Sequence, residues 1–191
     1  MIRTFLFLIC LVGLSSTALS SNILSNQTVK PVSVIDKGEL ILTNEGKLNY
    51  QPWTSQQLEG KVRTIQHIAG RSAAKELNAP LIEAIKQAKL PHDTYQTTTI
   101  INTDDAVFGT GVFVKNSVED SKKEFPYSQF IVDSDGVVKD AWSLSPENSA
   151  IIILNKQGKV LFFKEGSLTA AEIDKAIGLL VSELAKEQNL K

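Results

Sequence analysis

Cysteine is almost absent from this sequence. The 191 residues include a single cysteine, Cys10, which lies close to the N-terminus. Thiol–disulfide exchange and peroxide reduction both begin from a thiolate. A chain that loses its first twenty residues therefore cannot perform either reaction with its own side chains, and it has no internal disulfide. Such a chain has to be held together by packing and hydrogen bonds.

Groups that indicate other common functions are scarce as well. Lysine and arginine total 20 against 21 aspartates and glutamates, which gives a net charge of −1 and no basic excess for nucleic acid. The two histidines, His67 and His92, lack metal-ligand spacing, and no glycine-rich stretch has phosphate-binding spacing. The sequence therefore predicts no cofactor, no metal site and no nucleic-acid partner.

Long apolar runs are missing too, and the one short run is N-terminal. Arg3 precedes about ten apolar residues, 5–14, which are too few to span a bilayer. Ala18 and Ser20 are small residues at the positions that a leader peptidase requires. We predict a signal peptide at residues 1–20, cleaved after Ser20 with Ala18 as the alternative. The mature product is then exported and has no stable membrane association.

The rest of the chain has the pattern of a single domain. No repeat or long linker interrupts it after the leader. We expect residues 21–31 to form a flexible N-terminus and residues 32–191 to form one domain of ordinary size. Two β-prone runs flank Asp36-Lys37-Gly38, which predicts a small hairpin at the start of this domain.

Strand and helix patterns alternate after this point. A central strand is predicted at 62–69 and is followed by a helix that Pro80 should kink. Thr169 and Glu172 form a capping box that starts the last helix. The other predicted elements are strands at 94–101 and 130–132, a helix at 114–125 and a hairpin over 151–163. This order predicts an α/β fold, a three-layer α/β/α domain with a central mixed β-sheet.

Several positions support a comparison with a known fold. Gly60-Lys61-Val62 begins the central strand, and Pro80 lies in the helix that follows it. With the order of elements, these residues resemble the thioredoxin fold in its exported, peroxiredoxin-like or TlpA-like form. There the kink proline lies eight positions after the first cysteine of Cys-x-x-Cys. The resemblance implies that Ser72 and Lys75 fill the two cysteine positions and that Ser149 fills the cis-proline position.

Three longer strings are more specific. They are His67-Ile68-Ala69-Gly70-Arg71, residues 96–100 and residues 128–133, and they resemble the YtfJ family of small periplasmic proteins of Gram-negative bacteria. The match extends over nearly the whole mature chain. It implies a periplasmic location and a thioredoxin-like fold without the Cys-x-x-Cys motif, and it assigns no activity.

The candidate site lies where the central strand ends and the next helix begins, since open α/β sheets form clefts at such positions. A helix start favours anions, and two cations are nearby. We therefore expect a non-catalytic protein that binds a peptide, a protein partner or a small anion at this pseudo-active-site cleft. The alternative is that Arg71 and Lys75 are solvated surface groups. The candidate residues are His67, Arg71, Ser72, Lys75 and Ser149.

Two further interpretations remain open. Ser72 could act as a hydrolytic nucleophile if His67 served as its base. More generally, the protein could be a cysteine-independent enzyme that uses the peroxiredoxin-like pocket, with His67 or Arg71 acting on a bound substrate. The simpler interpretation makes Ser72 the N-cap of its helix. Asp104 and Asp105 could together hold calcium, but adjacent aspartates are more typical of a turn.

Overall fold

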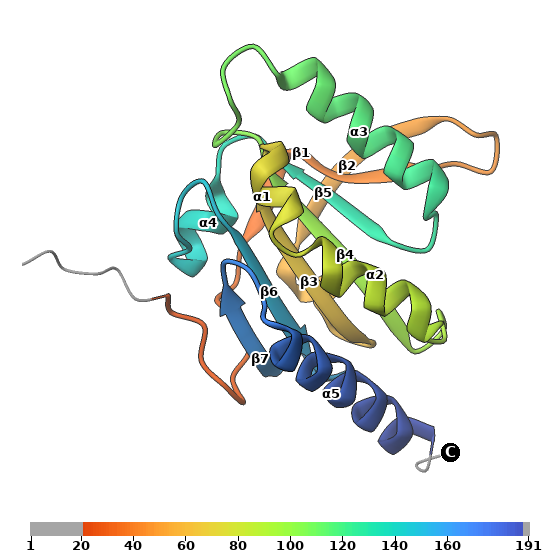
Figure 1. Cartoon of the computed structure of the whole chain (residues 1–191). Coiled ribbons are helices and arrows are strands. Elements are labelled where there is room, and N and C mark those ends of the chain that lie inside the picture. Colours follow the sequence, from red (N-terminus) through yellow and green to blue (C-terminus); the bar gives the residue numbers. More distant parts are fainter. Residues whose placement is uncertain (1–20, 189–191) are drawn as a thin grey trace, which may run out of the picture.

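One seven-stranded mixed sheet organises the molecule (Figure 1). The computed structural model describes residues 21–188, so the predicted signal peptide lies outside the described residues. The strand order is β2-β1-β5-β4-β3-β6-β7, and β3, β4 and β5 run parallel while the other pairs are antiparallel. The strands are β1 Ser33–Leu42, β2 Leu48–Thr54, β3 Val62–Ala69, β4 Tyr95–Asn102, β5 Gln129–Asp133, β6 Ser149–Leu154 and β7 Val160–Glu165.

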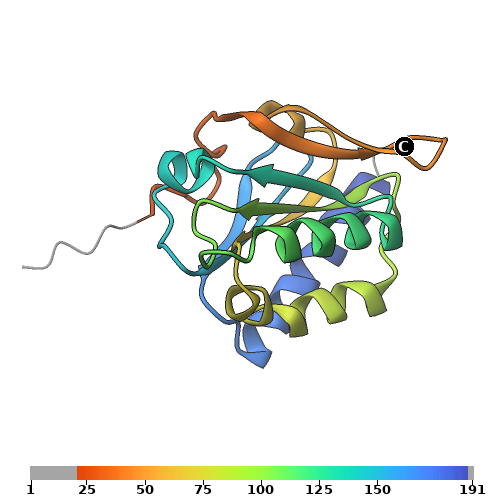
Figure 2. The same ribbon diagram turned by 90° about the horizontal axis from the view of Figure 1, so that it is seen from above.

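The two faces of this sheet are covered differently. Right-handed crossovers place the helices between β3, β4 and β5 on one face, and α5 packs beside α2 there, as Figure 2 shows. The other face is covered by α4, by η1 and by the N-terminal segment. The helices are α1 Ser72–Glu76, α2 Ala79–Ala88, α3 Gly111–Glu124, α4 Val137–Trp142 and α5 Ala170–Gln188, with a 3-10 helix η1 at Ser55–Leu58. The predicted α/β fold with a central mixed sheet is confirmed, although its second outer layer is thin.

Residues 21–31 are packed against the domain, contrary to the expected flexible N-terminus. Ile23 and Val29 are buried in the core on the α4 face. The backbone of the segment is hydrogen-bonded to Val160 at the start of β7. The Trp142 indole N–H donates to the carbonyl of Lys30 at 2.9 Å. A polar stretch therefore joins the fold through two apolar residues, and the packed domain begins before residue 32.

The predicted hairpin around Asp36-Lys37-Gly38 is wrong. These residues lie within β1, where the register against β2 is shifted, and Gly38 pairs with Val132 of β5. The chain reverses later, at the turn in which the Thr43 N–H donates to the Lys47 carbonyl at 2.8 Å. Gly38 has a φ of +73°, so it bends the strand as a β-bulge without reversing it.

The helix after β3 is broken close to Pro80, as predicted. It ends as α1 at Glu76 and resumes as α2 at Ala79. Pro80 lies in the first turn of α2, where its missing N–H costs no helical hydrogen bond. At the break, the buried Asn78 side chain donates to the Ser149 hydroxyl at 3.0 Å and to the Gly166 carbonyl at 3.1 Å. These bonds fix the start of α2 against β6.

Candidate functional site

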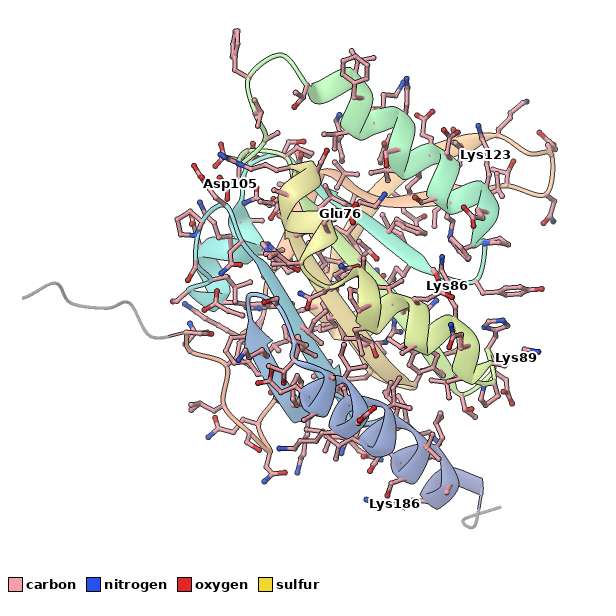
Figure 3. The ribbon with its side chains drawn as sticks, in the orientation of Figure 1. Glu76, Lys86, Lys89, Asp105, Lys123 and Lys186 are labelled. Carbon is pink, nitrogen blue, oxygen red and sulfur yellow. The ribbon has the colours of Figure 1, made fainter. Side chains whose placement is uncertain are left out.

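A cavity of about 700 Å³ lies on the helical face of the sheet, between α1–α2 and α3. Successive strand residues point to opposite faces, so alternate positions of β3 and β4 form its floor. The walls are side chains of α2 and α3, and most of the surface that lines the cavity is apolar. Figure 3 labels Lys86 of α2, which belongs to the lining, and Asp105 in the loop after β4, near the start of α1. The apolar lining includes Ile68, Ile101 and Phe130 of the floor, Ile82 and Ile85 of α2, and Val114 and Val118 of α3.

Three of the five predicted site residues line the cavity, and they lie together at one end. Ser72 is the first residue of α1, and Arg71 rather than Ser72 occupies the N-cap position, without a side-chain cap. The prediction that Ser72 caps the helix is therefore wrong. Lys75 is exposed on α1, and its Nζ approaches the Ser117 hydroxyl of α3 at 3.4 Å. Lys75 and Ser117 thus face each other across the mouth of the cavity.

Arg71 is held by two carboxylates. Its Nε donates to the Asp105 carbonyl at 2.7 Å, and its guanidinium lies 3.4 Å from the Asp105 carboxylate and 3.0 Å from that of Glu147. The Glu147 N–H also donates to Asp105. Arg71 therefore joins the start of α1 to the loops after β4 and before β6. Its charge is already matched, which makes it a structural clamp.

Asp104 and Asp105 do not converge on a common point. Asp105 is bound to Arg71, whereas Asp104 lies 4.0 Å from the Lys139 Nζ. The backbone forms a turn, in which the Ala106 N–H donates to the Thr103 carbonyl. Within residues 21–187, no group of three or more His, Cys, Asp or Glu residues could hold a metal ion. The favoured turn interpretation therefore fits this segment.

His67 faces away from the cavity. Its neighbours Gln66 and Ile68 line the cavity, so the His67 side chain points to the α4 face, where it is 3% exposed. Burial lowers the pKa of His67 to about 4, with Asp105 opposing this shift and Lys139 adding to it. The hypothesis that His67 acts as a base for Ser72 is inconsistent with this placement.

Ser149 lies under the break between α1 and α2. It is buried, pairs with Ile68 of β3 and accepts a hydrogen bond from Asn78. It is not among the residues that line the cavity. No cis peptide bond occurs among residues 21–188. The place that the resemblance assigned to a cis-proline is thus taken by a serine that anchors the helix break.

Most of the cavity lining was missed from the sequence. Thr97, Thr99 and Ile101 alternate along β4 and face the cavity, and this alternation was the only available signal. Lys86 of α2 lies over the Phe125 ring at 4.5 Å, a cation–π contact that bounds the far end. The partners in that contact lie on separate elements, so spacing along the sequence could not reveal it.

This chain is similar to a family of bacterial proteins and to two of its relatives. The family described as "Bacterial protein of unknown function (YtfJ_HI0045)" matches residues 23–183. The uncharacterized protein YtfJ of Escherichia coli K12 is 52% identical over 179 residues, covering 94% of this chain and 96% of that protein. An uncharacterized protein of Haemophilus influenzae is 45% identical over 178 residues, covering 93% and 96%.

The fold has a solved counterpart. The thioredoxin-like superfamily protein SPOA0173 superimposes with a TM-score of 0.55 at 15% identity, covering 83% of this chain and 97% of that one. At such low identity the likeness concerns the fold alone. It supports the thioredoxin-like architecture predicted from the order of strands and helices. The described residues contain no helix that is long and apolar enough to cross a membrane.

Proposed function

We propose that this chain, which belongs to the YtfJ family, is a non-catalytic thioredoxin-like protein that binds a partner molecule in the cavity beside its pseudo-active site. The cavity itself is the observation that carries the proposal. Its volume of about 700 Å³ falls in the range that accommodates small organic ligands. Ser72 and Lys75, which the resemblance assigns to the two cysteine positions, line the cavity.

The structure bears on which of the three ligand classes fits: a peptide, a protein partner or a small anion. Arg71 is paired with Asp105 and Glu147, so it offers little net charge to an inorganic anion. Beyond Lys75, most of the surface that lines the cavity is apolar. A ligand with an apolar part therefore fits better than a bare anion, whether that part belongs to a peptide, a protein or an organic anion.

The enzymatic alternative has less support. A cysteine-independent mechanism needs a base or a charged group directed at a substrate. His67 points to the other face of the sheet, and the guanidinium of Arg71 is held by two carboxylates. Neither residue named for this alternative is available in the cavity.

A cavity-filling substitution tests the proposed site. Val118 of α3 lines the cavity, so Val118→Phe should reduce its volume and weaken binding of the fluorescent apolar anion 1-anilinonaphthalene-8-sulfonate at least tenfold. Val181 lies on the exposed side of α5, so Val181→Phe is the matched control and should bind like the wild type. Thermal unfolding curves establish that both variants are folded. Equal binding by all three proteins would exclude the cavity as the site.

Export to the periplasm is the second part of the proposal. The signal-like residues 1–20 support it. Intact mass analysis of the protein from a periplasmic extract should give a chain that begins at Ser21. Recovery of the full-length chain in the cytoplasm would refute export, and a lipid-sized mass increment would refute simple cleavage.

A further inference from the structure

The cavity has features that select one class of ligand. We propose that it binds a small carboxylate with an unbranched alkyl chain, with the chain between α2 and α3 and the carboxylate at Lys75. This inference rests on the proposed function, since it names the ligand of the same cavity.

The walls along the cavity suit an alkyl chain. Ile82 and Ile85 of α2 face Val114 and Val118 of α3, over Ile101 and Phe130 of the sheet. An alkyl chain brings no polar groups into this space. A peptide backbone brings an N–H and a C=O at every residue, and burying these without partners is costly.

The hydroxyl groups of the lining do not contradict an apolar ligand, because several are already bonded within the protein. The Ser121 hydroxyl donates to the Ser117 carbonyl at 2.7 Å, as in a helix turn. The Thr110 hydroxyl donates to the Val107 carbonyl at 2.6 Å. The Thr97 hydroxyl is bonded to Tyr95 at 3.1 Å. These side chains can present their carbon atoms to a ligand without losing a hydrogen bond.

Lys75 supplies the charge for the carboxylate. Its Nζ contacts the Ser117 hydroxyl, and in the described part of the chain no carboxylate is paired with it. Arg71 beside it is neutralised by Asp105 and Glu147. Lys86 at the far end lies over Phe125 and shares the lining with Glu124, so the net positive charge is at the Lys75 end. This polarity places the head group at the mouth and the tail inside.

A group of exposed apolar side chains includes two residues of the cavity lining. Val107, Phe108, Val112 and Phe113 all belong to the loop before α3 and its first turn, and all are exposed. Val107 and Phe113 also line the cavity. Concentrated apolar exposure of this kind marks binding sites on soluble proteins. An alkyl chain entering beside these residues would cover part of them.

A chain-length series tests the proposal. Hexanoate, octanoate and decanoate are titrated below their micellar concentrations into the chain from Ser21 onward, with isothermal calorimetry as the readout. Each added methylene should tighten binding by about fourfold until the cavity is full. Lys75→Gln should weaken octanoate binding by about fivefold and leave 1-octanol binding unchanged. Lys175→Gln, at an exposed position of α5, is the matched control and should change neither.

The outcomes separate this inference from the proposed function. Steps of about sixteenfold between successive alkanoates, since each differs from the next by two methylenes, support both if they disappear in Val118→Phe. Binding of a short Leu- and Phe-rich peptide, lost in Val118→Phe, together with no binding of the alkanoates at millimolar concentration, would overturn the alkyl carboxylate and leave the proposed function standing. Binding of neither probe would overturn both. Alkanoate binding that Val118→Phe leaves unchanged would place the ligand elsewhere and overturn the inference.

Discussion

Two buried polar side chains of β3 point to the α4 face, and they differ in the hydrogen bonds that they form. Arg63 donates to the carbonyls of Leu58 at 2.7 Å and Gln57 at 2.6 Å, and burial lowers its pKa to about 10. His67 is buried as deeply, yet its Nε2 has no hydrogen-bond partner within the described residues. Burial without bonds to the charged form disfavours the protonated imidazole. The strand thus tolerates a charged arginine but keeps its histidine neutral.

Replacing His67 should make the free energy of unfolding depend less on pH below pH 6.5. In the unfolded chain a histidine is protonated near pH 6.5, whereas the folded protein holds the pKa of His67 at about 4. As the pH falls from 6.5 to 4, only the unfolded state gains this proton, so the free energy of unfolding decreases. Above pH 6.5 both states are neutral and the effect vanishes. Urea unfolding at pH 7 and pH 4 should show that the wild type loses up to about 3 kcal/mol more than His67→Leu.

His92 provides the comparison for this measurement. It is exposed and stacks on Tyr127 with ring centroids 4.4 Å apart. His92→Leu is therefore the control for removing a histidine ring that is not buried, and its urea unfolding is measured at the same two pH values. If His67→Leu and the wild type lose the same free energy between pH 7 and pH 4, then burial does not control the protonation of His67.

At the scale of single elements, β1 shows why a local turn signal can mislead. Asp36-Lys37-Gly38 has turn-forming residues, but the chain continues through it because β2 and β5 pair on either side. A Cβ at residue 38 would collide with the Gln51 carbonyl oxygen. Pairing with β2 and β5 decides whether this segment forms a bulge or a turn. The local sequence carries no information about that pairing.

Two glycines allow the bulge to be tested. Gly38 and Gly46 have similar positive φ values, +73° and +77°, but a Cβ at Gly46 would meet nothing within 4 Å. Gly46→Ala should cost only the backbone strain, about 1 kcal/mol. Gly38→Ala adds the collision inside the sheet and should cost at least about 2 kcal/mol more, by urea unfolding. Equal losses for the two variants would mean that β1 relaxes away from β2 without penalty.

Elements with strong local signals were predicted correctly. The capping box at the start of α5 is present, since the Thr169 N–H donates to the Glu172 carboxylate at 2.8 Å and the Glu172 N–H donates to the Thr169 hydroxyl at 3.3 Å. Helix α4 was missed because it has six residues and no apolar period to detect. Its start is fixed by Asp133, whose carboxylate accepts from the Val137 and Val138 N–H groups.

At the scale of the whole molecule, the sequence predicted the residues at one end of the cavity but not those that line its interior. Arg71, Ser72 and Lys75 were predicted from the rule that clefts open where parallel strands end, and all three line the cavity. The side chains that make the cavity deep come from α2, α3 and β4 together. The Arg71–Glu147 ion pair joins residues far apart in the chain. These properties depend on packing between elements, which no local pattern encodes.

The N-terminal segment provides the last prediction, because it extends the packed core beyond the predicted domain. Ile23 is 8% exposed and packs in the core of the α4 face, whereas the adjacent Leu24 is 53% exposed. Ile23→Ala should therefore lower the free energy of unfolding by about 2 kcal/mol, and Leu24→Ala should lower it by less than about 0.5 kcal/mol. Urea unfolding monitored by tryptophan fluorescence is suitable, because the Trp142 indole donates to the carbonyl of Lys30 within the same segment. Equal, small decreases in the free energy of unfolding for the two variants would support the expectation that residues 21–31 form a flexible N-terminus.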